Sequence, residues 1–117
     1  MLEHIERQEE SWPKRNAYSL SDIQPLIARL CQVSLEELIG KGGGPRVMFA
    51  RQTAMYLMHV VYGFSLTQIA ASFGRDRSLA SQACHRIEDL RDDPCFDHEM
   101  TQLEDLLRSA GANRGTP

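Results

Sequence analysis

The sequence feature that most constrains the fold is a pair of short helical segments joined at one glycine, over residues 66–83. Ala70 supplies the small side chain that two helices need where they cross steeply, and Gly74 supplies a turn residue that tolerates positive φ. The positions that face back towards a core are apolar or small: Ile69, Phe73, Ala80 and Ala83. This spacing predicts a helix-turn-helix, which we favour over a plain helical hairpin.

Helical patterns continue on both sides of this unit, and no segment alternates with the period of two that is typical of strands. Ser21 is expected to cap the first helix, and Ser34 opens a short second one through the capping-box pattern S-x-x-E. Pro94 is expected to break the fifth helix, and a last helix is expected from Asp97. The remaining helices are expected over residues 47–62, 66–73 and 77–92. The predicted class is all-α, with about six helices.

The chain is interpreted as one domain with an extension at each end. Residues 1–18 lack a sustained period and are interpreted as an N-terminal arm, whose Trp12 we expect to dock on the domain. Residues 19–109 are the expected helical domain, and residues 110–117 are expected to form a disordered tail. The composition, 42% apolar and 25% charged, is typical of a globular protein that buries a core of its own.

Targeting signals are not recognisable in the sequence. No apolar run approaches the roughly 18 residues that a membrane span needs, and the N-terminal residues lack the apolar region of a signal peptide. The cysteines are odd in number and far apart, without a C-x-x-C motif, so we expect reduced thiols: Cys31, Cys84 and Cys95. The predicted location is the cytoplasm.

Charge is distributed unevenly along the chain, although the net charge is only −3. Residues 41–87 hold six bases and one acid, whereas residues 1–40 and 88–117 are acidic. Attraction to phosphates acts within a Debye length of about 10 Å, so one basic face is sufficient to bind nucleic acid. The alternative is a chance cluster on a solvated surface. The acidic ends are candidate surfaces for a protein partner.

Motifs that would indicate an enzyme or a metal site fail on spacing. Residues 40–46 form a glycine-rich, basic loop, but no strand precedes it and no hydroxyl follows Lys41, as a phosphate-binding P-loop requires. Cys95 and His98 form a C-x-x-H pair, whereas a structural zinc site needs four well-spaced ligands. No serine, histidine and carboxylate set indicates a nucleophile. We therefore expect no catalytic residue, bound nucleotide, cofactor or metal.

Polar side chains cluster where the second helix of the central unit begins. Arg75, Arg77 and Ser78 can reach base edges or phosphates from a helix N-terminus, where the helix dipole favours negative charge. The fork of Arg77 suits guanine, and Ser78 suits a base or a phosphate. Asp76 either caps the helix or accepts a hydrogen bond from a cytosine amino group. These residues indicate double-stranded DNA as the ligand, with this helix in the major groove.

Several runs of the sequence together form a specific pattern: VSLEELIGK at 33–41, ARQTAMYL at 50–57, Ser65-Leu66, Ile69, Phe73-Gly74, Arg75-Asp76 and ACHRIE at 83–88. Through these runs the sequence, from about residue 20 to residue 107, resembles the C-terminal DNA-binding domain of the chromosomal replication initiator DnaA. The resemblance implies six helices around a helix-turn-helix of the Trp-repressor type. It implies that Arg51 and Gln52 contact phosphates and that Leu66 and Thr67 lie near the major groove. The full predicted DNA-binding set is Lys41, Arg46, Arg51, Gln52, Leu66, Thr67, Arg75, Asp76, Arg77, Ser78, Leu79 and Gln82.

The chain departs from the family's pattern at positions that matter for base reading. Residues 77–80 are Arg-Ser-Leu-Ala where the family has His-Thr-Thr-Val, and a glycine is missing after Gly74. Residues 42–44 are all glycine where the family's loop is rich in arginine and reaches the minor groove. The family's ATPase module has no counterpart in the sequence. These departures predict a DNA site that differs from the initiator's.

The predicted function is sequence-specific binding of double-stranded DNA at the nucleoid, in the regulation of transcription or of replication initiation, without ATPase activity. One alternative is a protein-interaction module that keeps the fold and turns its acidic ends to a partner. Another is an accessory that occupies initiator boxes and blocks initiation. The fold does not choose between them, because one fold can host different functions.

Overall fold

Serine side chains start three of the helices in the structure, a computed structural model that describes the backbone of residues 19–115 and the side chains of residues 19–109. The Oγ atoms of Ser19, Ser34 and Ser65 each accept a hydrogen bond from the amide three residues on, at 3.2, 3.0 and 3.1 Å. The side chains of Glu37 and Gln68 accept in return from the amides of Ser34 and Ser65, both at 2.9 Å. The capping box predicted at Ser34 is therefore confirmed.

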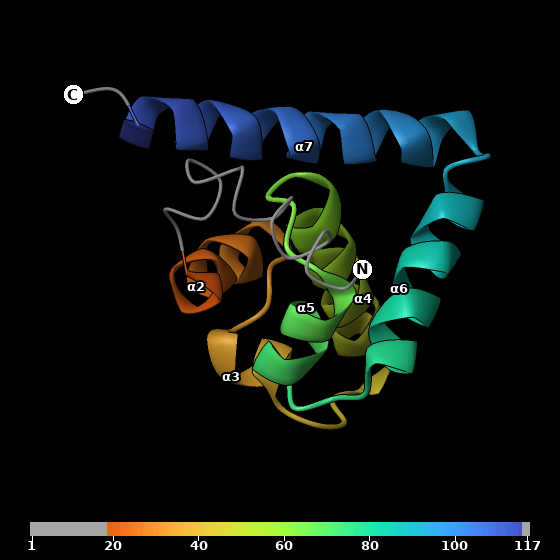
Figure 1. Cartoon of the computed structure of the whole chain (residues 1–117). Helices are drawn as coiled ribbons and strands as arrows, with labels where there is room; N and C mark the ends of the chain where they lie inside the picture. Colours follow the sequence, from red (N-terminus) through yellow and green to blue (C-terminus); the bar gives the residue numbers. More distant parts are fainter. Residues whose placement is uncertain (1–18, 116–117) are drawn as a thin grey trace, which may run out of the picture.

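The described residues form six helices and no strand, which confirms the predicted all-α class (Figure 1). The helices are α2 (Leu20–Leu30), α3 (Leu35–Ile39), α4 (Gly44–Val60), α5 (Leu66–Ser72), α6 (Arg77–Leu90) and α7 (Pro94–Gly115). The arm predicted over residues 1–18 lies outside the described residues.

Several helix boundaries differ from the predicted ones, each for a local reason. α2 is capped by Ser19 rather than two residues later, because Ser19 has the extended backbone of an N-cap residue. α4 begins at Gly44, since the proline after it is accepted in a first turn, where its missing N–H costs nothing. For the same reason Pro94, which was predicted only as a break, is the first residue of α7. This helix therefore begins three residues before the predicted start at Asp97. α7 continues to Gly115, past the predicted end of the domain.

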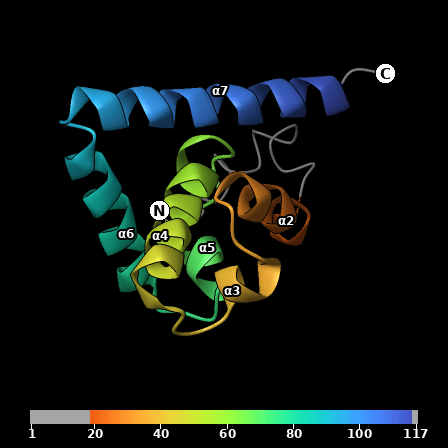
Figure 2. The ribbon, with the colours of Figure 1, turned by 180° about the vertical axis from the view of Figure 1, so that it is seen from behind.

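α4 is the central helix, and it is buried on nearly all sides along its middle, where residues 53–58 are all buried. A helix buried in this way needs neighbours all round. α2 and α3 lie on one side of it and α6 on the other, with α5 also in contact (Figures 1 and 2). The largest fully buried side chains are Phe73, Ile27, Leu38, Met55, Leu57, Met58, Ile69, Ile87, Met100, Leu107 and Val47.

α7 crosses one end of the bundle formed by the other helices (Figures 1 and 2). Met100 and Leu107 are buried at 2% and 1% exposure. Near its start, the ring of Phe96 packs against Phe49 of α4, with ring centroids 5.9 Å apart. α7 is therefore docked on the core through one apolar face.

Arg91, just after α6, ties α7 to α4. Its Nε donates to Oδ1 of Asp97 at 2.6 Å, its Nη1 donates to Oε2 of Glu104 at 2.6 Å and to the hydroxyl of Tyr56 at 2.9 Å, and its Nη2 donates to Oγ1 of Thr101 at 3.0 Å. Burial alone would lower the pKa of Arg91, but the bonds to Asp97, Glu104 and Tyr56 outweigh it and raise the pKa above its ordinary value. One charged side chain therefore holds the corner between three helices.

Removing Arg91 should destabilise the fold through the carboxylate that it leaves behind. Arg91→Ala deprives Glu104, whose side chain is 12% exposed, of its close partner, so we expect the free energy of unfolding to fall by about 2–3 kcal/mol. Arg108→Ala is the matched control, because Arg108 lies 3.9 Å from the same carboxylate but is exposed; it should cost less than about 0.5 kcal/mol. Urea unfolding followed by circular dichroism measures both. Equal losses would contradict this role for Arg91.

Candidate nucleic-acid interface

α5 and α6 meet at the turn predicted for a helix-turn-helix. Gly74 has a φ of +66° and so takes the left-handed conformation expected of it. The amide of Arg75 donates to the carbonyl of Ala70 at 2.8 Å, which folds the chain back across the end of α5. Ala70 and Ala80 are buried at 2% and 0% exposure, so the two helices pack closely. The turn thereby determines where α6 begins and which face it presents.

The first turns of α6 present polar side chains to solvent. Arg77, Ser78 and Gln82 are exposed, and no hydrogen bond or ion pair within the described residues engages their side chains. Asp76 occupies the N-cap position, but its side chain makes no capping hydrogen bond, so the structure does not show the capping role that was one of its two predicted roles. Six of the predicted residues line one hollow of about 490 Å³: Lys41, Arg75, Asp76, Ser78, Leu79 and Gln82.

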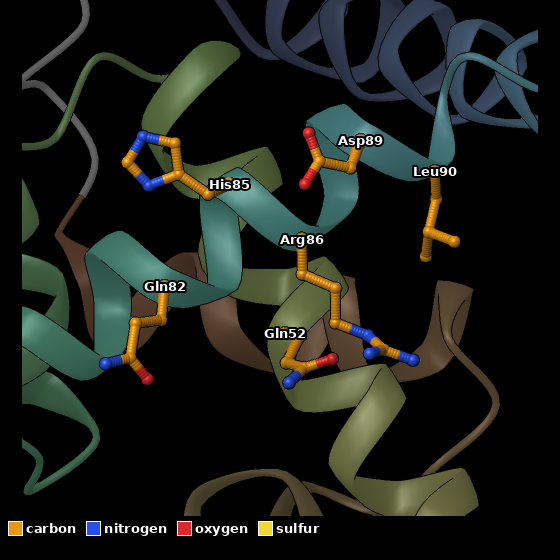
Figure 3. A pocket seen from close by; sticks show the side chains of 6 residues that line it. All are labelled: Gln52, Gln82, His85, Arg86, Asp89 and Leu90. Carbon is orange, nitrogen blue, oxygen red and sulfur yellow. The ribbon is translucent and has the colours of Figure 1, made fainter.

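A second hollow, of about 570 Å³, continues along α6 where it faces α4 (Figure 3). Gln52 of α4 and Gln82 of α6 both line it, and Arg86 extends towards Gln52 in Figure 3. Arg86 is absent from the predicted site, although its distance of four residues from Gln82 places it on the same helical face. Asp89 lines the same hollow but points away from Arg86. The run of basic and amide side chains thus extends one turn beyond the prediction.

The other exposed predicted residues lie on different elements. Thr67 is exposed and Leu66 half-buried in the first turn of α5. Arg46, in the first turn of α4, donates to the carbonyl of Gln32 at 3.0 Å and pairs with Glu37 at 3.4 Å. Both partners of this ion pair are exposed, so it contributes little stability and leaves Arg46 able to change partners.

Arg51 is the one predicted DNA contact that the structure buries, with 7% exposure. Its Nε donates to the carbonyl of Leu38 at 2.8 Å, and its Nη2 donates to the carbonyls of Glu37 at 2.7 Å and Gly42 at 3.1 Å. These carbonyls belong to the last turn of α3 and the loop after it, where helix carbonyls lack intrahelical partners. Burial first, and then the charge of Arg75, lowers the pKa of Arg51 from its ordinary value.

Arg75 ties the turn of the helix-turn-helix to the same loop. Its guanidinium donates to the carbonyl of Phe73 at 2.9 Å and to that of Gly40, far away in sequence, at 2.7 Å. We call residues 37–42, which Arg51 and Arg75 hold through their carbonyls, the arginine-bound segment. Lys41 belongs to this segment, so its place beside α6 depends on the two arginines. Bonds from side chains to distant carbonyls leave no local sequence pattern, so sequence reasoning missed them.

Three glycines, at the end of this segment and just after it, have backbone angles that other residues rarely adopt. Gly42, Gly43 and Gly44 have φ values of +76°, +97° and +80°. A Cβ at Gly43 would also lie 2.8 Å from Cβ of Val47. Because L residues rarely adopt such angles, this path does not suit the arginines that the DnaA family has in its loop. The glycine run therefore has a structural reason of its own.

Comparison with known protein families matches residues 20–87 to the family described as bacterial dnaA protein helix-turn-helix. The match begins with α2 and extends into α6, so it includes the helix-turn-helix and the arginine-bound segment, and it leaves α7 outside. Within residues 19–115, no helix is long and apolar enough to cross a membrane. The resemblance stated from the sequence is confirmed. Because the match covers more than half of the 117 residues, the chain belongs to the bacterial DnaA helix-turn-helix family.

Proposed function

We propose that the chain binds double-stranded DNA at specific sequences, with α6 in the major groove. One observation carries the proposal: Arg77, Ser78 and Gln82 are exposed on α6 beside Lys41, and the described fold uses none of their side-chain donors. Donors that are free on a rigid helix are what base reading requires, since a base edge must be met without first breaking bonds within the protein. Membership of the DnaA helix-turn-helix family supports the same ligand.

Each side chain at the start of α6 suits a different part of the DNA. The fork of Arg77 matches O6 and N7 of guanine, and the amide of Gln82 matches N6 and N7 of adenine. Ser78 suits a base or a phosphate, and the amides at the N-terminus of α6 favour a phosphate. Asp76, which makes no capping hydrogen bond, can accept from a cytosine amino group. Specificity then comes from α6, and position from the backbone contacts.

Backbone contacts are proposed on either side of α6. Lys41 and Arg86 supply positive charge there, and Gln52 and Thr67 supply uncharged donors. Arg51 is proposed to act indirectly, because its donors are directed to the carbonyls of the arginine-bound segment, which carries Lys41. Substitution of a residue that only positions a phosphate contact should lower the stability of the DNA-free protein as well as DNA binding. Substitution of a residue that makes the contact should lower DNA binding alone.

The biological role that we propose is the regulation of transcription or of replication initiation, without ATP hydrolysis by this chain. A role in binding another protein is the second candidate, and α7 is the observation that favours it. This helix lies outside the family match, and its outer face exposes acidic residues together with Leu106, which is 56% exposed. The two candidates differ in whether duplex DNA is bound at all.

Binding to duplex DNA should weaken steeply as salt rises. Lys41, Arg86 and the N-terminus of α6 offer about three phosphate contacts, so the logarithm of the binding constant should fall with the logarithm of salt at a slope of about −2.7. Fluorescence anisotropy of a labelled duplex between about 50 and about 200 mM salt measures the slope. Absent or salt-independent binding would favour the protein-binding role.

Arg51→Lys should separate a positioning role from a phosphate contact, because it keeps the charge but loses the planar fork. Lysine cannot serve three carbonyls in the same geometry, so we expect the free energy of unfolding of the DNA-free protein to fall by about 1–2 kcal/mol, with weaker DNA binding. Lys41→Ala is the control: it should weaken binding while changing stability by less than about 0.5 kcal/mol. If Arg51→Lys changes neither property, Arg51 contacts phosphate directly, as the family resemblance implies.

The chain should not share the DNA site of the initiator. Arg77 and Leu79 stand where the family has histidine and threonine, and the glycine run cannot place an arginine in a narrow minor groove. Each altered base contact is worth about 1–3 kcal/mol, so two or three together should lower affinity for an initiator box by about a hundredfold or more. Competition between a box duplex and a scrambled duplex at physiological salt tests this. A preference for the box above about tenfold would favour the box-blocking accessory.

A further inference from the structure

Two exposed apolar side chains line one pocket on the proposed reading surface. Met48, in the first turns of α4, is 54% exposed, and Leu79, near the start of α6, is 41% exposed. Single exposed apolar side chains are ordinary on protein surfaces and need no explanation. These two, from different helices, border the same pocket of about 280 Å³. Two exposed apolar side chains that border one pocket suggest that the pocket binds a ligand.

The pocket remains apolar towards the core. Met55 lies two turns after Met48 on the same face of α4, and Ala83 lies one turn after Leu79 on α6; both line the pocket and both are 2% exposed. Water in contact with such a surface gains no hydrogen bond from it, so filling it with an apolar group is favourable. The pocket therefore suits a small apolar group.

The remaining walls restrict what can carry that apolar group. Gln52 and Gln82 add amide groups, and Arg51 and Arg75 add positive charge. Leu79 and Gln82 also line the neighbouring hollow that contains Lys41, so the pocket opens on the surface proposed to meet DNA. These walls suit a nucleotide in DNA. The amide groups can bond to the edge of its base, and the positive charge attracts its phosphate.

We propose that this pocket receives the 5-methyl group of a pyrimidine, either thymine or 5-methylcytosine, between Met48 and Leu79. The inference rests on the proposed DNA binding and deepens it. Among the unmodified bases, the thymine methyl is the apolar group that the major groove exposes. The flexible thioether of Met48 can adapt to such a group. Gln82, on the same pocket wall, suits the adenine that pairs with thymine.

The test starts from the duplex that the purified full chain prefers after selection from a random pool. Each thymine is replaced in turn by deoxyuridine, which removes only the methyl group, and each cytosine by 5-methylcytosine, which adds only a methyl group. If thymine is the occupant, we expect one replacement to weaken binding by about fourfold, the value of one buried methyl group. If 5-methylcytosine is the occupant, methylation at one cytosine should instead strengthen binding by about fourfold.

Variants assign the methyl effect to the pocket. It should disappear in the double variant Met48→Ala/Leu79→Ala and persist in Leu106→Ala, a control that truncates an exposed leucine on α7. Since all three side chains are exposed, the variants should unfold at the same urea concentration as the parent. An effect below about twofold at every position, or one that persists in the double variant, would overturn the inference while leaving DNA binding intact. Absence of all duplex binding would overturn the proposed function and this inference with it.

Discussion

The orientation of α6 towards its proposed ligand depends on hydrogen bonds between two guanidinium groups and the carbonyls of residues 37–42. Arg51 reaches these carbonyls from the central helix, and Arg75 reaches them from the turn that starts α6. Helix C-terminal carbonyls carry partial negative charge and lack intrahelical partners, so buried cations stabilise them strongly. These bonds link α3, α4 and the helix-turn-helix to one another, and Lys41 lies on the segment that they hold.

Not all of the basic side chains in residues 41–87 are free to bind a ligand. Six bases fall within residues 41–87, but Arg51 is buried and Arg75 is bound to two carbonyls, while Arg46 pairs with an exposed carboxylate. The basic side chains without a partner in the described fold are therefore concentrated around α6. Arg91 plays a similar part at the other end of the fold, where it binds the carboxylates of Asp97 and Glu104 on α7 and the hydroxyl of Tyr56 on α4. Arginine suits both places because its planar fork serves several acceptors at once.

The departures from the DnaA pattern fit together when they are placed on the structure. The glycine run takes positive φ angles that exclude a loop of arginines, so minor-groove reading by that loop is not available. The start of α6 instead combines a forked guanidinium at Arg77 with an apolar pocket bordered by Leu79 and Met48. Both suit the major groove, where guanine acceptors and the thymine methyl are exposed. The DNA binding that we propose therefore reads bases in the major groove alone.

The sequence by itself determined the class, the turn and the outward face of α6, because these depend on neighbours within a few residues. The cap at Ser34, the left-handed turn at Gly74 and the buried alanines of α5 and α6 are all short-range features, and all appear as predicted. Only the tertiary structure decided what the arginines do and which side chains share a pocket. The sequence does not show whether an arginine binds a phosphate or a backbone carbonyl. For Arg51 the partner is a carbonyl, because the packing of α3 against α4 places the unpaired carbonyls at the end of α3 within its reach. Met48 and Leu79 likewise become neighbours only because α4 packs against α6, a contact between segments far apart in sequence that no local period records.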